Sequence, residues 1–509
     1  MRAPSAPHAT TTASLLAALV LLAGCGDGGG AATDGPRAAG APVLLIVLDA
    51  LHAEHMSHLG YERETTPHLD ALAADGISFR RAFSPAPYTR AGIPSIHTGR
   101  LPDVHGMVSG DTALADSEVT LAELFAEAGY ATRAAVANLN GSELYHLDQG
   151  FDEFDNYLMP RNGRSADFET RGTWFHQPKA EEYVPLVERW LDEDGEAPGF
   201  YYLHFLEPHS PYYPPEEFKT RWLDPDYDGI FAAGHTADLV ATVKGELDTD
   251  AADRRAIKAM YDATLAYVDS QVGAIVDDLK ARGRYDDFVI VVTSDHGEAM
   301  FQHGRWGHND HLYDEMVHIP LIVKLPGNPS PVDGADDVMV SNMDIAPSLI
   351  EWCDLEPPGV RMDGSSLEAL VFDEDLEAFD RDRELILRTN ELEPDLALRT
   401  QTDKTIVVRF PKGKIQRLEH YDLVADPLEQ KNLRQSMQDI VAERAQKLVE
   451  YRKAAATRLA DRPELELTEA QKALLVELGY AEDGGSPGED AGAQDGDAQD
   501  DDASAPQDE

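Results

Sequence analysis

Two unbroken apolar runs constrain the fold of this chain more than any other feature. Val43 to Leu48 and Phe288 to Val292 are hydrophobic at every position, and most of these residues are branched aliphatics. A strand that is apolar on both faces gains stability only when both faces are covered, as happens inside a parallel sheet. The two runs therefore predict an α/β fold with a large, mostly parallel, doubly wound sheet between helices.

Acidic side chains follow both runs. Asp49 comes directly after the first run, and Asp295 and His296 come shortly after the second. Open α/β sheets bind ligands just beyond the carboxyl ends of their strands, so these distant residues can meet. Carboxylates with an imidazole suit a divalent cation. The alternative is that the Ser-Asp-His-Gly run at 294–297 is only a turn that ends a strand.

Thr89 is a candidate nucleophile. It follows the turn-prone stretch Ser84 to Pro87, and the residues after it can begin a helix. Backbone N–H groups and the helix dipole would then face an anion near the hydroxyl. The pKa of a free hydroxyl is too high for unaided attack, so a metal or a base must activate it. The alternative is that Thr89 only caps the helix.

The order of motifs resembles the sulfatase family of the alkaline-phosphatase-like superfamily. The matching stretches cover nearly the whole chain after residue 42, and they lie at 43–51, 65–83, 94–106, 120–132, 150–154, 200–215, 293–298, 318–323, 343–355 and 420–433. Some of these stretches are weak alone, but their order is specific.

The resemblance implies a metal site made by Asp49, Asp295 and His296. It places the nucleophile nine positions before Thr98, which is Thr89, and it implies that His209 and His308 contact the ester or protonate its leaving group. Histidine suits this task because its pKa lies near neutrality.

Other features of the resemblance leave more open. His303 and His311 are expected to orient the ligands from behind. For His209 the alternative is a surface loop histidine beside prolines. The family suggests calcium as the ion, whereas an imidazole ligand favours manganese, zinc or magnesium.

The chain departs from the family at three places. Sulfatases carry a Cys or Ser in a Cys-x-Pro-Ser-Arg run that is oxidised to formylglycine, but Thr89 to Ile93 holds neither that residue nor the following Pro and Arg, so formylglycine is not expected. Ala50 replaces the family's second acid, and Ala-Val-Ala-Asn at 135–138 replaces its Gly-Lys-Trp-His run. A Thr nucleophile with an Asp-His pair is similar to phosphoryl-handling members of the superfamily.

The same reading predicts the order of elements. A catalytic domain spans 43–370, with strands near 43–48, 131–136, 200–206, 288–293 and 319–323 and helices near 181–193 and 254–282. A C-terminal α+β subdomain spans 371–480, with a small antiparallel sheet made from runs at 385–389, 396–400, 405–410 and 420–423, a helix at 438–459 and a short last helix at 467–480. An acidic tail at 481–509 is predicted to be disordered.

The N-terminus has the pattern of an export signal. Residues 1–25 end in Leu22-Ala23-Gly24-Cys25, which resembles a bacterial lipobox and implies a lipid anchor on Cys25, with 26–42 as a flexible tether. An ordinary cleaved signal or a short buried helix is the alternative. Cys353 lies in an apolar stretch and is expected to be a buried thiol. The formal net charge of −50 argues against a nucleic-acid partner.

These observations predict an exported, lipid-anchored, metal-dependent hydrolase of sulfate or phosphate esters with a Thr nucleophile. Its substrate would be a small-molecule, glycan or lipid ester. Two alternatives remain: a transferase that moves a phospho-headgroup onto a glycan or lipid, and a catalytically inactive binding protein with a sulfatase fold. The sequence does not predict the oligomeric state.

Overall fold

A computed structural model gives the structure of residues 37–156, 179–231, 249–329, 332–372, 378–389, 393–410 and 414–459. The signal at 1–25 with Cys25, most of the tether at 26–42, the helix at 467–480 and the tail at 481–509 lie outside these residues, so they stay predictions. No helix within the described ranges combines the length and the hydrophobicity that crossing a membrane requires.

A large mixed sheet forms the centre of the protein. In the described residues it has eight strands, in the order β10 (Val340–Ser341), β2 (Ile77–Phe83), β9 (His318–Lys324), β6 (Val289–Thr293), β1 (Val43–Leu48), β5 (Gly199–Phe205), β3 (Ala131–Val136) and β4 (Glu153–Asn156). Strand β9 runs antiparallel to β2 and β6, and the other neighbours are parallel. The predicted fold class, a mostly parallel α/β sheet, is confirmed.

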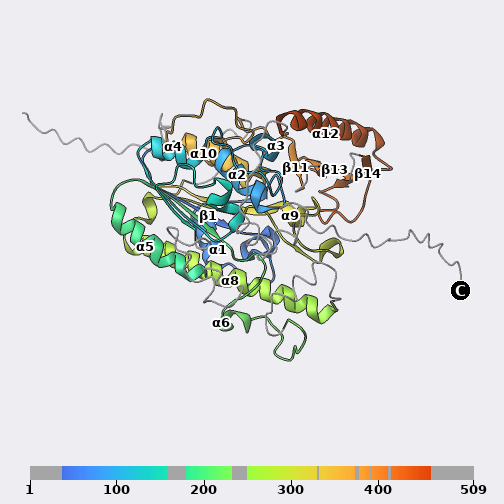
Figure 1. Ribbon diagram of the computed structural model, residues 1–509. Helices are drawn as coiled ribbons and strands as arrows, with labels where there is room; N and C mark the ends of the chain where they lie inside the picture. Colours follow the sequence, from blue (N-terminus) through green and yellow to red (C-terminus); the bar gives the residue numbers. More distant parts are fainter. Residues whose placement is uncertain are drawn as a thin grey trace, which may run out of the picture. The chain divides into compact units, whose positions relative to one another are not determined.

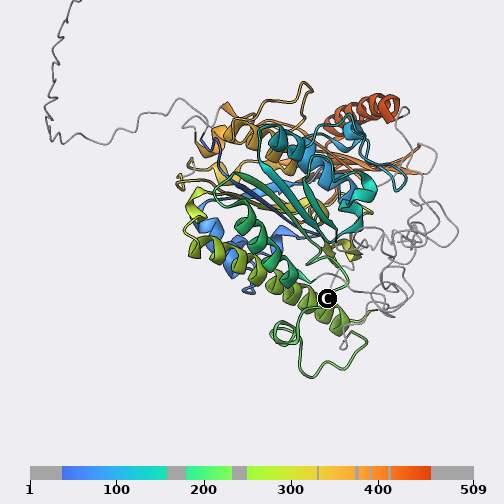
Figure 2. The same cartoon turned by 60° about the vertical axis from the view of Figure 1, so that its left-hand side comes forward.

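Helices cover both faces of this sheet (Figures 1 and 2). One face carries α1 (Pro67–Asp75), α5 (Tyr183–Asp194) and α8 (Ala251–Ala281), and the other carries α2 (Thr89–Thr98), α4 (Leu121–Glu127) and α10 (Ile345–Trp352). Alternate residues of β1 enter the two cores: Val43, Leu45 and Val47 pack on one side, and Leu44, Ile46 and Leu48 on the other. This two-sided burial explains why the strand is apolar at every position.

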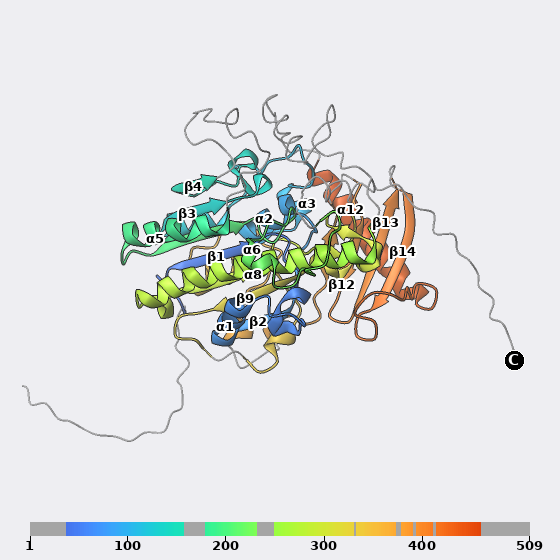
Figure 3. The same ribbon diagram turned by 90° about the horizontal axis from the view of Figure 1, so that it is seen from below.

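A four-stranded antiparallel sheet follows in the C-terminal part, at the right of Figure 3. Its strands are β11 (Leu385–Arg388), β12 (Leu396–Arg399), β13 (Asp403–Phe410) and β14 (Lys414–Asp422), and α12 (Gln438–Leu459) packs on it through Ala445 and Leu448. The predicted small sheet and its helix are thus present. A buried ion pair between Arg388 and Asp103 joins this sheet to α3 (Pro102–His105).

The remaining short elements are α6 (Glu216–Lys219), α9 (Asp314–Val317), α11 (Glu368–Val371) and the hairpin of β7 (Ala299–Met300) with β8 (Trp306–Gly307). The sequence reading did not identify β2, β4 or β10. Strand β2 carries two arginines at its centre, Arg80 and Arg81, where the pairing with β9 is irregular. Strand β10 is only two residues long.

Candidate active site

The carboxyl ends of β1 and β6 bring Asp49, Asp295 and His296 together, as the sequence predicted. Strands β1 and β6 are parallel neighbours, so both end at the same edge of the sheet. His296 Nε2 lies 3.5 Å from Asp49 Oδ1 and 3.5 Å from Asp295 Oδ2. His296 Nδ1 donates to the Gly297 carbonyl at 2.8 Å, which leaves a lone pair on Nε2. All three side chains are buried.

One oxygen of each carboxylate is already held by the protein. Asp295 Oδ1 accepts from the backbone N–H groups of His296 at 2.9 Å and Ala50 at 3.2 Å, and Asp49 Oδ2 accepts from Asn138 Nδ2. The other oxygens, Asp49 Oδ1 and Asp295 Oδ2, are buried and have no hydrogen-bond partner among the described residues. Two unpartnered carboxylate oxygens beside an imidazole lone pair fit a divalent cation, because buried charge without a partner is strongly unfavourable.

The electrostatics of the site suit the same ligand role. Burial alone would raise the pKa of Asp49, but His209, His204 and His296 lower it overall. Burial lowers the pKa of His296. Asp49 is therefore an anion and His296 is neutral at neutral pH, and these are the protonation states that bind a metal.

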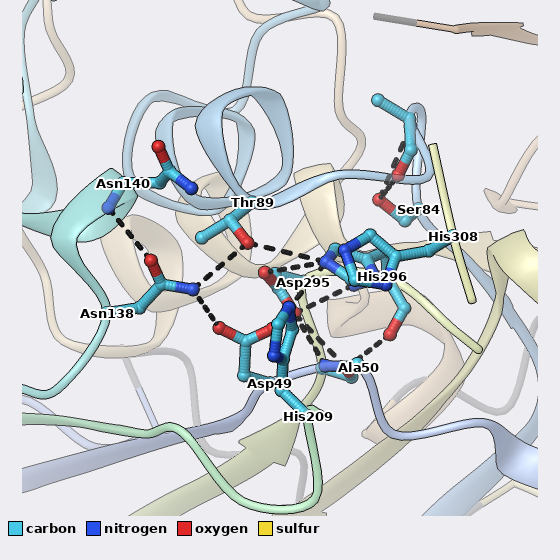
Figure 4. A network of polar contacts seen from close by, with 12 residues as sticks. Asp49, Ala50, Ser84, Thr89, Asn138, Asn140, His209, Asp295, His296 and His308 are labelled. Atoms are coloured by element: carbon cyan, nitrogen blue, oxygen red, sulfur yellow. Dashed lines mark hydrogen bonds and ion pairs between the residues drawn. The ribbon is translucent and has the colours of Figure 1, made fainter. Parts of the chain in front are cut away.

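Thr89 faces this group from the start of α2 (Figure 4). Its Oγ1 lies 3.4 Å from His296 Nε2 and accepts from Asn138 Nδ2 at 3.3 Å. The N-cap of α2 is Tyr88, so the alternative that Thr89 only caps the helix is wrong. A Cβ on Gly92 would lie 2.4 Å from the carbonyl oxygen of Asp295, so this glycine allows the close approach of α2 to the acidic residue.

His209 and His308 lie close to His296. The ring centroids of His308 and His296 are 4.4 Å apart, and those of His209 and His308 are 4.8 Å apart. Only 8% of His209 is exposed, so the alternative of a surface loop histidine is wrong. His308 Nδ1 lies 3.1 Å from Glu298 Oε2, and burial raises the pKa of Glu298 to about 7.

Three polar residues of the site were not named as functional from the sequence. Asn138 contacts both Asp49 and Thr89, His204 Nε2 lies 3.2 Å from Asp49 Oδ2, and Glu298 contacts His308. Asn138 follows the carboxyl end of β3, and His204 is a fully buried histidine in the apolar strand β5. Ligands bind beyond the carboxyl ends of parallel strands, and this rule, applied to β3 and β5 as well, could have found Asn138 and His204.

Comparisons with known proteins identify the family of this chain. The model of the sulfatase family matches residues 42–355. The chain belongs to the sulfatase family. A second family model, of the C-terminal region of N-sulphoglucosamine sulphohydrolase, matches residues 302–454.

Individual relatives are distant but cover most of the chain. An arylsulfatase of Clostridium perfringens is 25% identical over 378 residues, which is 65% of this chain and 78% of the relative. The iduronate 2-sulfatase of Homo sapiens is 24% identical over 376 residues, 64% of this chain and 67% of that protein. The crystal structure of a phosphonate monoester hydrolase of Agrobacterium radiobacter has a TM-score of 0.63 at 23% identity, covering 85% of this chain and 99% of that one. The names of these relatives of the sulfatase-family protein describe two sulfatases and a phosphonate monoester hydrolase.

The structure of this sulfatase-family protein shows what the residues do at two positions where the sequence departs from the family. Ala50, at the position of the second acid, adopts a left-handed backbone with φ of 58° and donates its N–H to Asp295. Asn138, the last residue of the altered 135–138 run, donates to Asp49. The site therefore keeps two acids and one imidazole around Thr89.

His303 and His311 lie farther back than expected. His303 Nδ1 lies 2.8 Å from Glu315 Oε1, its Nε2 lies 3.2 Å from the Glu429 carbonyl, and its ring stacks on Tyr313. His311 Nε2 lies 3.8 Å from Glu315. These contacts connect the turn between β7 and β8 to Glu315 and to the C-terminal part. The expectation that the two histidines orient the metal ligands therefore finds no support in their contacts among the described residues.

Proposed function

We propose that this protein is a metal-dependent hydrolase in which the Thr89 hydroxyl attacks phosphate or phosphonate monoesters, with sulfate esters as slower substrates. The observation that carries the proposal is the position of Thr89 Oγ1, 3.4 Å from His296 Nε2 and beside the unpartnered oxygens of Asp49 and Asp295. The names of the relatives support ester hydrolysis, and the phosphonate monoester hydrolase with the same fold supports phosphorus chemistry.

The residues that would hold the cation are Asp49, Asp295 and His296, with Thr89 as a neighbour. A bound divalent cation would supply Lewis-acid chemistry, which lowers the pKa of a nearby hydroxyl and offsets charge on the ester. Asn138 holds Thr89 Oγ1 and Asp49 Oδ2 in one orientation through a shared amide. The beginning of α2 directs backbone N–H groups towards the anionic oxygens of the ester.

The reaction follows from these positions in two balanced steps. The deprotonated Thr89 oxygen forms a bond to phosphorus while the bond to the alcohol breaks, and His209 or His308 gives its proton to the departing oxygen. Water then attacks the phosphorus of the phospho-threonine, the same histidine takes the proton of that water, and the Thr89 oxygen leaves. The products are phosphate, or a phosphonate when the substrate is a phosphonate monoester, and the free enzyme. Formylglycine would release sulfate by elimination, and Thr89 cannot, so sulfate turnover should be slower.

The test is a substrate panel on the full chain. Chromogenic phosphate monoesters, phosphonate monoesters, phosphodiesters and sulfate esters, including sulfated monosaccharides, are compared between wild type, Thr89→Ser and Thr89→Ala. We expect Thr89→Ser to keep measurable activity and Thr89→Ala to lose at least about a thousandfold in kcat, because a missing nucleophile removes the covalent route. A phospho-threonine trapped on Thr89 and found by mass spectrometry would support the covalent step.

Other outcomes would contradict the proposal. Activity that survives Thr89→Ala removes Thr89 from the mechanism. Robust sulfatase activity with a negligible phosphoesterase rate would refute the substrate order. Product transfer to added alcohols in preference to water would favour the transferase alternative, and no turnover with any ester would favour the inactive binding protein.

We also propose that the mature protein begins at Cys25 and carries lipid there. The supporting observation is the Leu-Ala-Gly-Cys ending of the N-terminal apolar segment. Changing Cys25 to Ser should move the protein from the membrane fraction to the soluble fraction. Continued membrane association of Cys25→Ser would contradict this proposal.

A further inference from the structure

A second group of metal-binding side chains lies near the active-site edge of the sheet. His52 and Glu54 follow β1, the latter within the short helix η1 (Ala53–His55), and His318 begins β9. One ligand atom from each of these three residues lies within 4.8 Å of the other two. The group shares no residue with Asp49, Asp295 and His296, although the three-residue step from Asp49 to His52 spans at most about 11 Å of chain.

His52 is buried without a partner on one of its ring nitrogens. Only 1% of the residue is exposed, and its Nδ1 has no hydrogen-bond partner among the described residues. Its ring lies 6.5 Å from the ring of His318, centroid to centroid. A buried polar atom with no partner is unfavourable, so a ligand bound at this position would be stabilising.

His318 is held in the orientation of a metal-bound histidine. Its Nε2 lies 2.8 Å from the carbonyl oxygen of Arg80. A carbonyl only accepts, so Nε2 carries the hydrogen and Nδ1 keeps the lone pair. Histidines that bind metals usually donate their other N–H to a backbone carbonyl in this way. The ring also stacks on Phe83 at 5.1 Å between centroids, which limits its rotation.

The charges of the group fit a cation as well. His52 and His318 would coordinate a metal as neutral imidazoles. Glu54 contributes a carboxylate at the exposed side of the group. Lys258 is a nearby opposing charge, and Asp314 is a nearby favourable one.

We propose that His52, Glu54 and His318 bind one divalent transition-metal ion of the zinc type, separate from the ion of the active site. Two imidazoles and one carboxylate form a donor set that zinc uses with three protein ligands and one open position. Tetrahedral zinc with bonds of about 2.0–2.1 Å holds its ligands about 3.4 Å apart, so the three atoms must draw together slightly. Exposed Glu54 is the side chain that can make this movement.

The proposed site joins two segments that are far apart in the chain. It would link the segment after β1 to the first residue of β9, which lies two strands away in the sheet across β6. An ion there should therefore stabilise the fold at the edge where the strands end. The open position would take a water molecule or an anion.

The test counts zinc in the full chain and does not use catalysis, so it is independent of the proposed function. Chelator-stripped Asp49→Asn/Asp295→Asn protein, which lacks both carboxylate ligands of the active site, is titrated with Zn²⁺ and measured by elemental analysis after dialysis. We expect one tightly bound equivalent, and the same protein with His318→Ala should bind none. Co²⁺ should give the visible absorption of a tetrahedral ion in the first protein and lose it in the second.

Matched variants make the outcome decisive. Glu54→Gln, at the exposed side, should weaken zinc binding at least about tenfold without changing the thermal unfolding of the metal-free protein. His68→Ala, which removes an exposed histidine on α1, should change nothing. In the wild-type background, His318→Ala should lower the zinc content by one equivalent. This measurement tests the proposal even if the Asp49→Asn/Asp295→Asn protein folds poorly. No zinc bound to the Asp49→Asn/Asp295→Asn protein, or an equivalent that survives both His318→Ala and Glu54→Gln, would overturn the proposal.

Discussion

Replacing Glu207 by Gln should make the protein more stable at alkaline pH and change the pH dependence of its stability. Glu207 follows β5 two residues before His209, and its Oε1 accepts from the backbone N–H of Ala180 at 3.2 Å. The residue is half-buried, but Oε2 is buried without a hydrogen-bond partner in the described part of the chain. Burial raises the pKa of this carboxyl to about 7, from an ordinary value of 4.5.

The sign of the effect follows from proton binding. The folded state binds the proton of Glu207 more tightly than the unfolded state does, so stability from this group is complete below about pH 4.5 and is lost as the pH rises through about 7. The full pKa shift corresponds to about 3 kcal/mol of unfolding free energy, and about 2 kcal/mol of this is lost as the pH rises from about 5.5 to about 8. Gln keeps the acceptor for Ala180 and has no proton to lose.

The assay is urea unfolding of wild type and Glu207→Gln at these two pH values. The advantage of the variant in unfolding free energy should grow by about 2 kcal/mol from the lower to the higher pH. Glu217→Gln, which removes an exposed carboxylate after the same strand, should show no such growth. An advantage of Glu207→Gln that is equal at both pH values would refute the claim that this carboxyl is protonated in the folded protein.

Three further predictions concern the site and the packing around it. Asn138→Leu removes the hydrogen-bond donor shared by Asp49 and Thr89. It should lower kcat/KM about 10- to 100-fold with the best ester of the panel, because hydrogen bonds to charged groups contribute about 1.5–3 kcal/mol. An unchanged kcat/KM would contradict the role given to this amide. Arg388→Met leaves Asp103 buried without its ion partner, although Tyr451 still donates a hydrogen bond to it. The unfolding free energy measured in urea should fall by about 3–5 kcal/mol. A loss below about 1 kcal/mol would contradict the buried ion pair. Thr120→Ala removes the N-cap of α4 and should cost about 1 kcal/mol in the same measurement, with no effect on kcat.

Much of the fold could be read from local sequence because the elements carry their own patterns. Strand β1 is apolar at all its positions and ends where the run ends, at Leu48, and α12 occupies the predicted residues Gln438–Leu459. Helix α1 begins at Pro67 and ends directly before Gly76, and Pro and Gly are typical of these two helix ends. A two-sided buried strand and a helix with clear ends leave a pattern that needs no knowledge of their neighbours.

Part of the site could also be predicted, because parallel strands bring their carboxyl ends to one edge. That rule was enough to expect Asp49, Asp295 and His296 in one place. It could not say which oxygen of each acid would remain unpartnered, since this depends on the positions of Asn138 and the Ala50 backbone. Nor could it show that Thr89 Oγ1 is turned towards His296 and away from a capping role.

Only the tertiary structure decided the order and direction of the strands. Strand β9 follows β6 in the chain and pairs with it antiparallel, which brings His318 to the edge where β1 delivers His52. The local pattern of an apolar strand does not reveal its direction, because successive side chains point to opposite faces of the sheet whichever way the strand runs. The sequence by itself therefore determined the family and those elements that carry a clear local pattern, whereas the meeting of residues more than two hundred positions apart depended on how the elements pack.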